Sequence, residues 1–385
     1  MSTVSMATMR LRDVTRGKLK LANISILLPN LCGGGVERIS ITLAQEFSRA
    51  GHEVEFVLMQ ARGELLEEAR ANFSVVDLAT PRARALPLAL ARHLRRRRPD
   101  ALLVAMWPLT VIAPLAARLS GCRCKVLVSE HGILSAQYRD WGRIHRVALR
   151  SSMAIGYRLA DRRVGVSSGV AADIAALSGL PHDAFDVIHN PISPRPEPST
   201  DAIHDAEALW SSRKGARIVT VGTMKAVKNH ALLLRAFAQI DRPEARLMFV
   251  GDGEGKAGLR ALAADLAIAG QVIFAGFHPD PTPFYQTADL FVLSSDYEGF
   301  GNVIVEALAC GVSVVSTDCP SGPAEILENG RFGMLVPVGD PSALAQAIER
   351  AMSATPDPVA LQARAADFAP EIAAEKYLRL LTVKD

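Results

Sequence analysis

The sequence predicts an α/β protein made of two Rossmann-like, doubly wound domains that face each other across a cleft. Three observations carry this expectation. Short apolar runs alternate with longer amphipathic stretches along most of the chain, a proline-rich stretch interrupts the alternation near the middle, and 385 residues suit about two domains. Repeated strand–helix order implies parallel sheets with helices packed on both faces.

The first half begins with a short apolar run that is typical of a buried strand. Strands are expected at residues 24–28, 54–59, 102–106, 126–128 and 163–166, and helices at 36–50, 86–97, 110–119 and 169–177. Residues 101–117 are all uncharged and could in principle span a membrane. Pro108 and Pro114 interrupt them, however, which favours a buried strand, a turn and a short helix.

The middle of the chain carries four prolines within residues 190–198, a pattern typical of a semi-rigid linker. The alternation then resumes, with strands expected at 217–221, 246–250, 271–275, 290–293 and 312–316 and helices at 231–239, 257–268, 302–309 and 323–328. We therefore expect a first domain at 21–193, a linker at 194–214 and a second domain at 215–368. A last helix within 369–385 is expected to cross back to the first domain.

Charge and cysteine content narrow the function classes. The formal net charge is +3, and residues 1–20, expected to form a flexible basic extension, carry +4 of it, so the remaining 365 residues sum to −1. The nearly neutral charge of these 365 residues argues against nucleic-acid binding, which usually needs a basic domain. Five cysteines are few and odd in number, and residues 1–20 lack an apolar signal sequence. Both observations favour a reducing, cytoplasmic location.

One helix is unusually basic. Leu86, Leu90 and Leu94 form an apolar stripe, and Arg95 to Arg98 crowd the C-terminal end of the helix. One interpretation is a surface helix whose cations complement the negative end of the helix dipole. The other is peripheral contact with an anionic membrane, at the inner face of which the protein would then work.

Three loops have the features of a phosphate-binding site. The first is the glycine run Gly33, Gly34 and Gly35, which lies directly before a helix whose free N–H groups can hold an anion. The second follows the strand at 217–221 and contains Gly222, Thr223 and Lys228, whose ammonium could neutralise a diphosphate. On their own, such loops can also be tight strand–helix turns or solvated lysines.

The third loop is the most informative. Glu298 and Glu306 lie on either side of the helix start at Asn302, with Gly299 and Gly301 between them. Both carboxylates should lie near one helix N-terminus, whose dipole attracts phosphate, and each can accept hydrogen bonds from sugar hydroxyls.

These residues resemble the retaining glycosyltransferases of family 4, group 1, which have the GT-B fold. The resemblance rests on the E-x7-E pair Glu298 and Glu306 and extends, in order, over almost the whole chain from about residue 21. Further matches are the loop at 33–38, Ser129-Glu-His-Gly132, residues 166–173, Asn190-Pro191, residues 250–254 and residues 320–325.

The resemblance implies a sugar transfer from a nucleotide-diphosphate sugar (a UDP- or GDP-sugar) to a glycan or lipid-linked acceptor, in cell-surface polysaccharide or glycolipid biosynthesis. It implies the donor in the second domain, the acceptor in the first, retention at the anomeric carbon, no metal and no other cofactor. The implied catalytic residues are His131, Glu298 and Lys228. The implied donor-binding residues are Gly34, Gly35, Gly222, Thr223, Lys228, Gly251, Glu298, Gly299, Phe300, Gly301, Asn302, Val303 and Glu306.

The sequence departs from the family pattern at one position, and two alternative functions stay open. Many relatives carry an arginine where this chain has Thr223, and Lys225 is the available substitute charge. A non-catalytic nucleotide-sugar-binding protein on the same fold is therefore one alternative. The other is an NAD-dependent oxidoreductase, because Gly253, Gly255 and Gly258 fit the G-x-G-x-x-G pattern, although no acid stands at the end of the next strand. We expect His189, His230, Trp107 and Trp141 to be structural.

Overall fold

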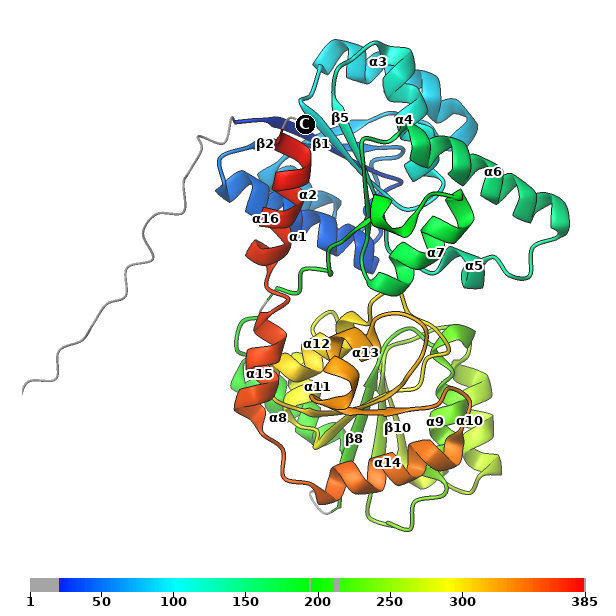
Figure 1. Ribbon diagram of the computed structural model, residues 1–385. Coiled ribbons are helices and arrows are strands. Elements are labelled where there is room, and N and C mark those ends of the chain that lie inside the picture. The colour runs from blue at the N-terminus through cyan, green and yellow to red at the C-terminus, as the bar shows by residue number, and fades with distance from the viewer. Residues whose placement is uncertain (1–20, 194, 211–214, 384–385) are drawn as a thin grey trace, which may run out of the picture.

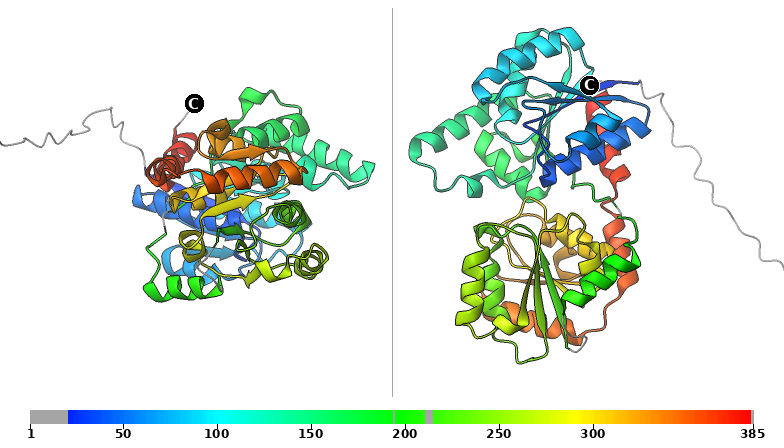
Figure 2. Two further views of the ribbon diagram at one scale, coloured as in Figure 1. Left: turned by 90° about the horizontal axis from the view of Figure 1, so that it is seen from below. Right: turned by 180° about the vertical axis from the view of Figure 1, so that it is seen from behind.

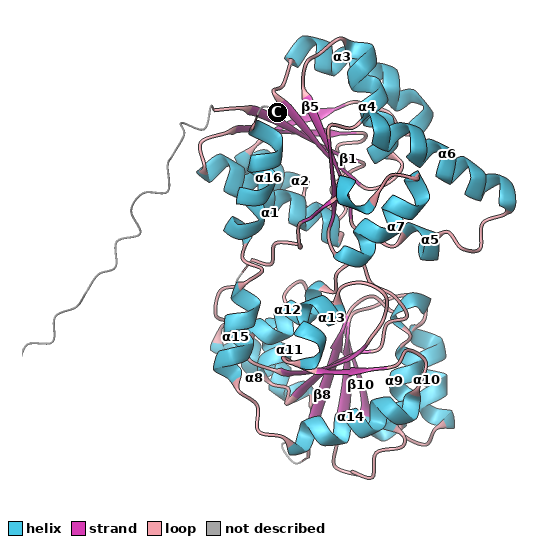
Figure 3. Cartoon of the chain, in the orientation of Figure 1, coloured by secondary structure: helices cyan, strands magenta, loops and turns pink. Residues whose placement is uncertain are grey.

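The computed structural model describes residues 21–193, 195–210 and 215–383, and shows two α/β domains stacked end to end (Figure 1). The first domain has a seven-stranded sheet in the order β3-β2-β1-β4-β5-β6-β7, and the second has a six-stranded sheet in the order β10-β9-β8-β11-β12-β13. Every strand pair is parallel. Helices cover both faces of each sheet (Figure 3), which confirms the expected fold class.

The first domain contains every strand and helix that the sequence predicts there. Its strands are β1 Asn23–Leu28, β2 Glu53–Leu58, β3 Ser74–Asp77, β4 Ala101–Ala105, β5 Lys125–Glu130, β6 Arg162–Gly165 and β7 Asp186–Val187. Its helices are α1 Gly35–Arg49, α2 Leu66–Asn72, η1 Ala83–Ala85, α3 Leu86–Arg97, α4 Leu109–Ser120, α5 Leu134–Gln137, α6 Arg143–Leu159, α7 Ser168–Ser178 and η2 His182–Ala184. The additional strands β3 and β7 are short edge strands, and the main addition is the 17-residue helix α6.

The second domain also contains the predicted elements. Its strands are β8 Arg217–Val221, β9 Arg246–Val250, β10 Val272–Gly276, β11 Leu290–Leu293, β12 Ser313–Thr317 and β13 Met334–Val336. Its helices are α8 Thr200–Leu209, η3 Ala226–Lys228, α9 His230–Phe237, α10 Lys256–Asp265, η4 Ala269–Gln271, α11 Thr282–Gln286, α12 Asn302–Ala309, α13 Pro323–Ile326, η5 Glu328–Gly330, α14 Pro341–Ser353 and α15 Pro358–Ala366. The final helix of the chain is α16 Pro370–Thr382.

The segment expected to be a linker at 194–214 contains helix α8, which occupies residues 200–209. The backbone N–H of Ala202 donates to the Ser199 hydroxyl at 3.2 Å, which caps the helix. Trp210 is fully buried in the second domain, and its indole N–H donates to the Thr287 hydroxyl at 3.0 Å. Residues 199–210 are therefore anchored to the second domain, because burying a tryptophan holds the chain in place.

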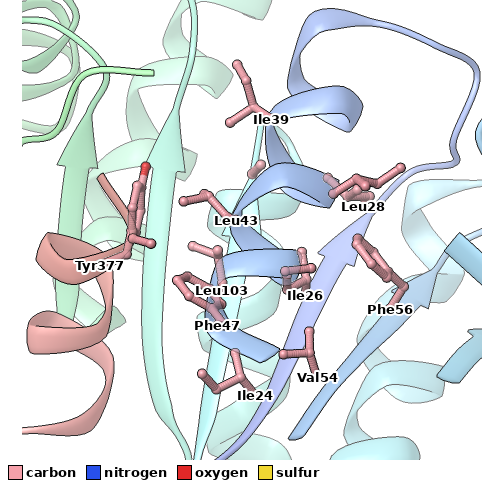
Figure 4. Packing of buried hydrophobic residues seen from close by; sticks show 14 of the residues in the cluster. Ile24, Ile26, Leu28, Ile39, Leu43, Phe47, Val54, Phe56, Leu103 and Tyr377 are labelled. Atoms are coloured by element: carbon pink, nitrogen blue, oxygen red, sulfur yellow. The ribbon is translucent and has the colours of Figure 1, made fainter. Parts of the chain in front are cut away.

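The C-terminal helix α16 returns to the first domain and lies beside α1, whereas α15 lies on the second domain (Figures 1 and 2). Its Tyr377 and Leu381 belong to the same buried cluster as Ile24, Leu43 and Phe47. Figure 4 shows Tyr377 beside this group of β1 and α1 side chains. The end of the chain thus completes the core of its first domain.

The apolar stretch at 101–117 forms strand β4 and the first part of helix α4. Among the described residues, none of the helices has the length and hydropathy needed to cross a bilayer. The expected basic extension at 1–20 lies outside the described residues.

Candidate active site

The carboxyl ends of the two sheets meet at one place. His131 follows β5 in the first domain, and Gly299 lies in the loop between β11 and α12 in the second. A Cβ atom added to Gly299 would stand 1.9 Å from the carbonyl oxygen of His131, which no side chain can tolerate. The backbones of the two domains therefore touch here because position 299 is glycine.

The ion pair between Lys228 and Glu298 lies at this meeting point. The Lys228 ammonium donates to Glu298 Oε1 at 2.7 Å, and the Ser295 hydroxyl donates to the same oxygen at 2.6 Å. Both partners are largely buried, with 20% and 11% of their side chains exposed. A charge in such a place is costly unless it is paired, so Glu298 holds Lys228 in the site.

Two loops are tied together around this pair. Asn229 follows Lys228 in the left-handed conformation (φ 42°), and its side-chain oxygen accepts from Leu232 N at 3.2 Å, capping α9. Its amide donates to Asp296 at 2.7 Å, and the Ser294 hydroxyl donates to the Lys228 carbonyl at 2.9 Å. The loop after β8 and the loop after β11 therefore form one unit that fixes the position of Lys228.

Glycines let the loops after β8 and β9 pack backbone to backbone. A Cβ at Gly251 would lie 2.0 Å from the Gly222 carbonyl oxygen, and one at Gly253 would lie 2.8 Å from Met224 N. Gly255 likewise packs on the Met224 carbonyl, whereas Gly258 faces open space. Close packing between loops thus accounts for two glycines of the G-x-G-x-x-G pattern without a dinucleotide.

Helix α12 begins with free backbone donors. Its N-cap is Gly301 (φ 99°), which has no side chain to accept hydrogen bonds from the first turn. The N–H groups of Asn302 and Val303 find no acceptor among the residues that the structure describes. The start of α1 is close by, because a Cβ at Gly35 would lie 3.9 Å from Asn302 Nδ2. An anion placed here would meet uncapped amides and a positive helix end.

His131 has one ring nitrogen engaged and one free. Its Nε2 lies 3.2 Å from the Ser129 hydroxyl, whereas its buried Nδ1 has no hydrogen-bond partner among the described residues. Burial lowers the pKa of His131 to about 4, against a smaller opposing effect of the nearby Asn190 amide, so the ring is neutral at pH 7. Asn190 itself donates to Asn302 Oδ1 at 2.9 Å across the domains, and its own Oδ1 is unpartnered within the described chain.

Glu306 lies on α12, four residues after Asn302. The Tyr285 hydroxyl donates to Glu306 Oε2 at 3.3 Å, and Arg195 comes within 3.7 Å of its other oxygen. Burial raises the pKa of Glu306, and the positive charge of Arg195 opposes that shift. Arg195 also pairs with Asp280 at 2.9 Å. Tyr285 and Arg195 carried no motif in the sequence, and only the fold brings them to Glu306.

The sequence and the fold match known sugar-transferring enzymes. Residues 33–195 match the model "Glycosyltransferase Family 4", and residues 215–354 match "Glycosyl transferases group 1". The chain belongs to the family 4, group 1 glycosyltransferases. Together the two matches cover most of both domains, so the expected family is confirmed and the protein is an enzyme that transfers sugars.

Individual relatives agree with this assignment. The chain is 28% identical over 365 residues, 91% of its own length and 96% of the relative's, to the lipopolysaccharide core biosynthesis glycosyltransferase LpsE of Rhizobium meliloti. It is 28% identical over 235 residues (61% of this chain) to N-acetylgalactosamine-N,N'-diacetylbacillosaminyl-diphospho-undecaprenol 4-alpha-N-acetylgalactosaminyltransferase of Campylobacter jejuni, of whose length this match spans 62%.

Solved structures share the fold. A glycosyltransferase from Rickettsia africae superposes with a TM-score of 0.80 at 20% identity, over 94% of this chain and 98% of its own. Anabaena HepE, solved in complex with UDP and glucose, superposes with a TM-score of 0.79 at 21% identity, over 94% and 99%. At these identities the likeness concerns the GT-B fold alone.

Some residues that the sequence predicted for the site of this glycosyltransferase have surroundings other than those expected. The Phe300 side chain is 2% exposed and stacks on His189, so only its backbone could contact a donor. His189, expected to be structural, also shares a hydrogen bond with Glu325 at 3.0 Å across the domains. Thr223 is exposed, and the exposed Lys225 has no ion-pair partner among the described residues.

The first domain of the glycosyltransferase adds a cluster that the sequence did not reveal. The rings of Trp107, Tyr138 and Trp141 contact one another, with centroids 4.2–5.7 Å apart. Beside them lies Glu130, fully buried, which accepts from Trp107 N at 3.3 Å and from the Tyr157 hydroxyl at 3.1 Å. The two tryptophans do pack, as expected, but as part of this aromatic cluster next to His131.

Metal-ligating side chains do not gather in the part of the chain that the structure describes, since no group of three or more His, Cys, Asp or Glu forms there. The prediction of a metal-free reaction stays a prediction.

Proposed function

We propose that this glycosyltransferase takes its sugar from a UDP- or GDP-sugar and passes it to a glycan or lipid-linked acceptor. The observation that carries the proposal is the Lys228–Glu298 pair next to the uncapped start of α12. A lysine and free helix amides are groups that hold a diphosphate. The ribose of the nucleotide is proposed to meet Glu306, whose carboxylate can accept hydrogen bonds from hydroxyl groups.

The site must stabilise the nucleoside diphosphate, which gains negative charge as it leaves the sugar. Lys228 has three N–H donors, and Glu298 occupies one of them, which leaves the others for phosphate oxygens. The amides of Asn302 and Val303 would stabilise the same charge without a metal ion. The Glu37 carboxylate lies against Gly34, so the α1 loop with Gly34 and Gly35 is the less open of the two helix starts.

Neutral His131 is proposed to donate a hydrogen bond to the donor sugar through its free Nδ1. This role fits the geometry because Nε2 is already engaged by Ser129 and protonation at pH 7 is suppressed by burial. We propose retention at the anomeric carbon on the family resemblance alone.

The acceptor is proposed to bind the first domain and to be lipid-linked or part of a cell-surface glycan. The names of two relatives support this class: one acts in lipopolysaccharide core biosynthesis, and the other acts on a diphospho-undecaprenol-linked sugar. We also propose cytoplasmic action at the inner face of a membrane. All five cysteines are free thiols, as a reducing compartment would keep them.

A thermal-shift screen against UDP, GDP, ADP and NAD tests the donor class. Stabilisation by one nucleoside diphosphate, lost in Lys228→Ala and kept in Lys225→Ala, is the expected result. Both lysines belong to the same loop, so the second variant controls for loop charge. Stabilisation by NAD alone, or an equal shift with both lysine variants, would contradict the proposed donor site.

A further inference from the structure

The aromatic cluster of Trp107, Tyr138 and Trp141 is partly open to solvent. All three residues are half-buried, and their ring centroids lie 5.3, 5.7 and 4.2 Å apart. Among the described residues, every ring-to-ring contact outside this cluster includes at least one buried ring. Aromatic rings that face water as a group, beside a candidate active site, are typical of a binding surface.

The ring of Trp107 is held in place by the protein itself. Its indole N–H donates to the Ser152 hydroxyl on α6 at 3.3 Å, and that hydroxyl donates to the Leu149 carbonyl at 2.8 Å. Its backbone N–H donates to Glu130 Oε1 at 3.3 Å. Because the polar group of the indole is already engaged, what this ring offers a ligand is apolar surface in a fixed position, which lowers the entropic cost of binding.

The cluster adjoins the first-domain half of the site. Ala105 on β4 is paired with Ser129 on β5, and Trp107 and His131 each follow this pair by two residues. Met106, between them on the β4 side, has a left-handed backbone (φ 68°), and its N–H donates to the Ser129 carbonyl at 3.2 Å. Strained non-glycine residues of this kind are concentrated at functional sites, and this one turns the chain toward the end of β5.

Polar side chains surround the rings. The Gln137 amide donates to the Tyr138 hydroxyl at 3.2 Å, and the His145 ring lies 5.7 Å from that of Trp141. Gln137, His145 and the neighbouring Asp140 are all exposed. Hydrogen-bonding groups thus stand at the edge of an apolar aromatic surface. A pyranose needs this combination, because it has a face of C–H groups with hydroxyl groups around its edge.

We infer that Trp107, Tyr138 and Trp141 form the subsite for the acceptor sugar. The pyranose that receives the transferred sugar packs its C–H face against these rings and directs one hydroxyl toward His131. A polyprenyl chain could also pack on aromatic rings, but the group of the acceptor that reacts is a sugar hydroxyl. The sugar is therefore the part of the acceptor that lies beside His131. The inference rests on the proposed function and adds to it the residues that select the acceptor.

Tryptophan fluorescence tests the subsite directly. The chain has three tryptophans, and the third, Trp210, is fully buried in the second domain. The full-length protein, saturated with the nucleoside diphosphate that stabilises it, is titrated with the methyl pyranosides of glucose, galactose, mannose, N-acetylglucosamine and N-acetylgalactosamine. We expect a saturable change in emission with at least one of them, in the millimolar range that suits so small a ligand.

Variants of the two loop residues show whether the rings make the contact. Trp141→Ala and Tyr138→Ala should each weaken the affinity for that sugar about 3- to 10-fold, as the loss of one aromatic contact does. Trp141→Phe and Tyr138→Phe keep a ring and should restore most of the affinity. Trp107 remains the reporter in all four variants. Retained melting temperatures would show that the variants are folded.

A matched control lies in the same domain. Phe73 is half-buried against Phe56 and directly precedes β3, so it lies at the amino ends of the strands, away from the site. Phe73→Ala removes an aromatic ring of the same domain and should leave the sugar affinity unchanged. The thermal shift with the nucleoside diphosphate should persist in every variant, so that a failure of this subsite is distinguished from a failure of the donor site.

Three results would overturn the inference. The first is the absence of a saturable emission change with any of the five sugars in protein that binds the nucleoside diphosphate. The second is a sugar affinity that Trp141→Ala and Tyr138→Ala leave unchanged, or that Phe73→Ala lowers equally. The third is a saturable response to geranyl phosphate and to none of the sugars, which would assign the rings to the lipid chain of the acceptor.

Discussion

The hydroxyl of Tyr377 on the C-terminal helix lies 2.9 Å from the hydroxyl of Ser129 at the end of β5. Ser129 in turn lies 3.2 Å from Nε2 of His131, so the last helix of the chain is connected to the candidate catalytic ring. Burial raises the pKa of Tyr377 to about 12, against a smaller opposing effect of the Ser129 hydroxyl. Each hydroxyl can donate or accept, and the proposed N–H at Nδ1 of His131 requires that Tyr377 donate to Ser129 and Ser129 to Nε2.

Removing this connection should reduce turnover without abolishing the fold. We expect Tyr377→Phe to lower kcat about fivefold, and Ser129→Ala about tenfold, because each loses a hydrogen bond that orients the ring. The donor KM should stay the same, and ring ¹⁵N chemical shifts of His131 should report a mixed tautomer. Ser120→Ala, which removes a buried serine hydroxyl elsewhere in the domain, should change stability alone. Wild-type kcat and ring shifts in Ser129→Ala would refute the connection.

Lys228 should carry more of the activity than its neighbour Lys225. Lys228→Ala removes the cation beside Glu298 and should lower kcat/KM by about 10²- to 10³-fold, as the loss of a leaving-group donor does. Lys225→Ala should change it less than about twofold, because that exposed side chain is outside the pair. Steady-state kinetics with the donor identified by thermal shift measure both. Equal losses would mean that Lys225 compensates for Thr223 after all.

A methyl group at position 299 should separate the domains. Gly299→Ala places a Cβ 1.9 Å from the His131 carbonyl oxygen, so the domains must move apart and kcat/KM should fall about 10²-fold. Gly258→Ala is the control: its Cβ meets open space within α10, and it should raise stability by about 0.5–1 kcal/mol. Small-angle scattering should show a larger radius of gyration for Gly299→Ala only. An unchanged kcat/KM would show that this contact is not needed for the reaction.

The ionisation of Glu130 should lower the free energy of unfolding as the pH rises from about 4.5 through about 7. Burial raises its folded-state pKa to about 7 from 4.5, so the folded protein binds more protons than the unfolded chain between these values. Stability is therefore lost as the pH rises through this window. His131 and His230, whose pKa values burial lowers to about 4 from 6.5, act oppositely for as long as the unfolded histidines still bind protons.

Melting temperatures measured between about pH 6 and pH 8 isolate the carboxyl group. The stability advantage of the unmodified protein over Glu130→Gln, which cannot ionise at this position, should shrink over this range, because both proteins share the histidines. An equal pH dependence in both proteins would assign it to other groups.

The order of the predicted strands and helices could be derived from the sequence, because the spacing of apolar residues along the chain shows which side of each element is buried. The edge strands β3 and β7 were missed because they are short and half-exposed. Helix α6 was missed because its second, exposed apolar side blurs the pattern of a surface helix. Helix α8 was hidden by the prolines before it, although Ser199 is a normal N-cap.

For the site, motif spacing located Lys228, Glu298 and the glycines, since these residues lie in loops whose sequence pattern is local. It could not reveal Arg195, Tyr285 or Tyr377, which reach the site from distant segments and depend on tertiary packing. The sequence also predicted Phe300 as a donor-binding residue, whereas its ring is buried in the core of the second domain.

The return of α16 to the first domain has a consequence for biosynthesis. A ribosome releases residues 21–193 long before it makes Tyr377 and Leu381, which fill the space beside Ile24 and Phe47. The first domain therefore keeps part of its interior open until α16 has been made, and a chain truncated before residue 370 would lack part of the core of the domain that is made first.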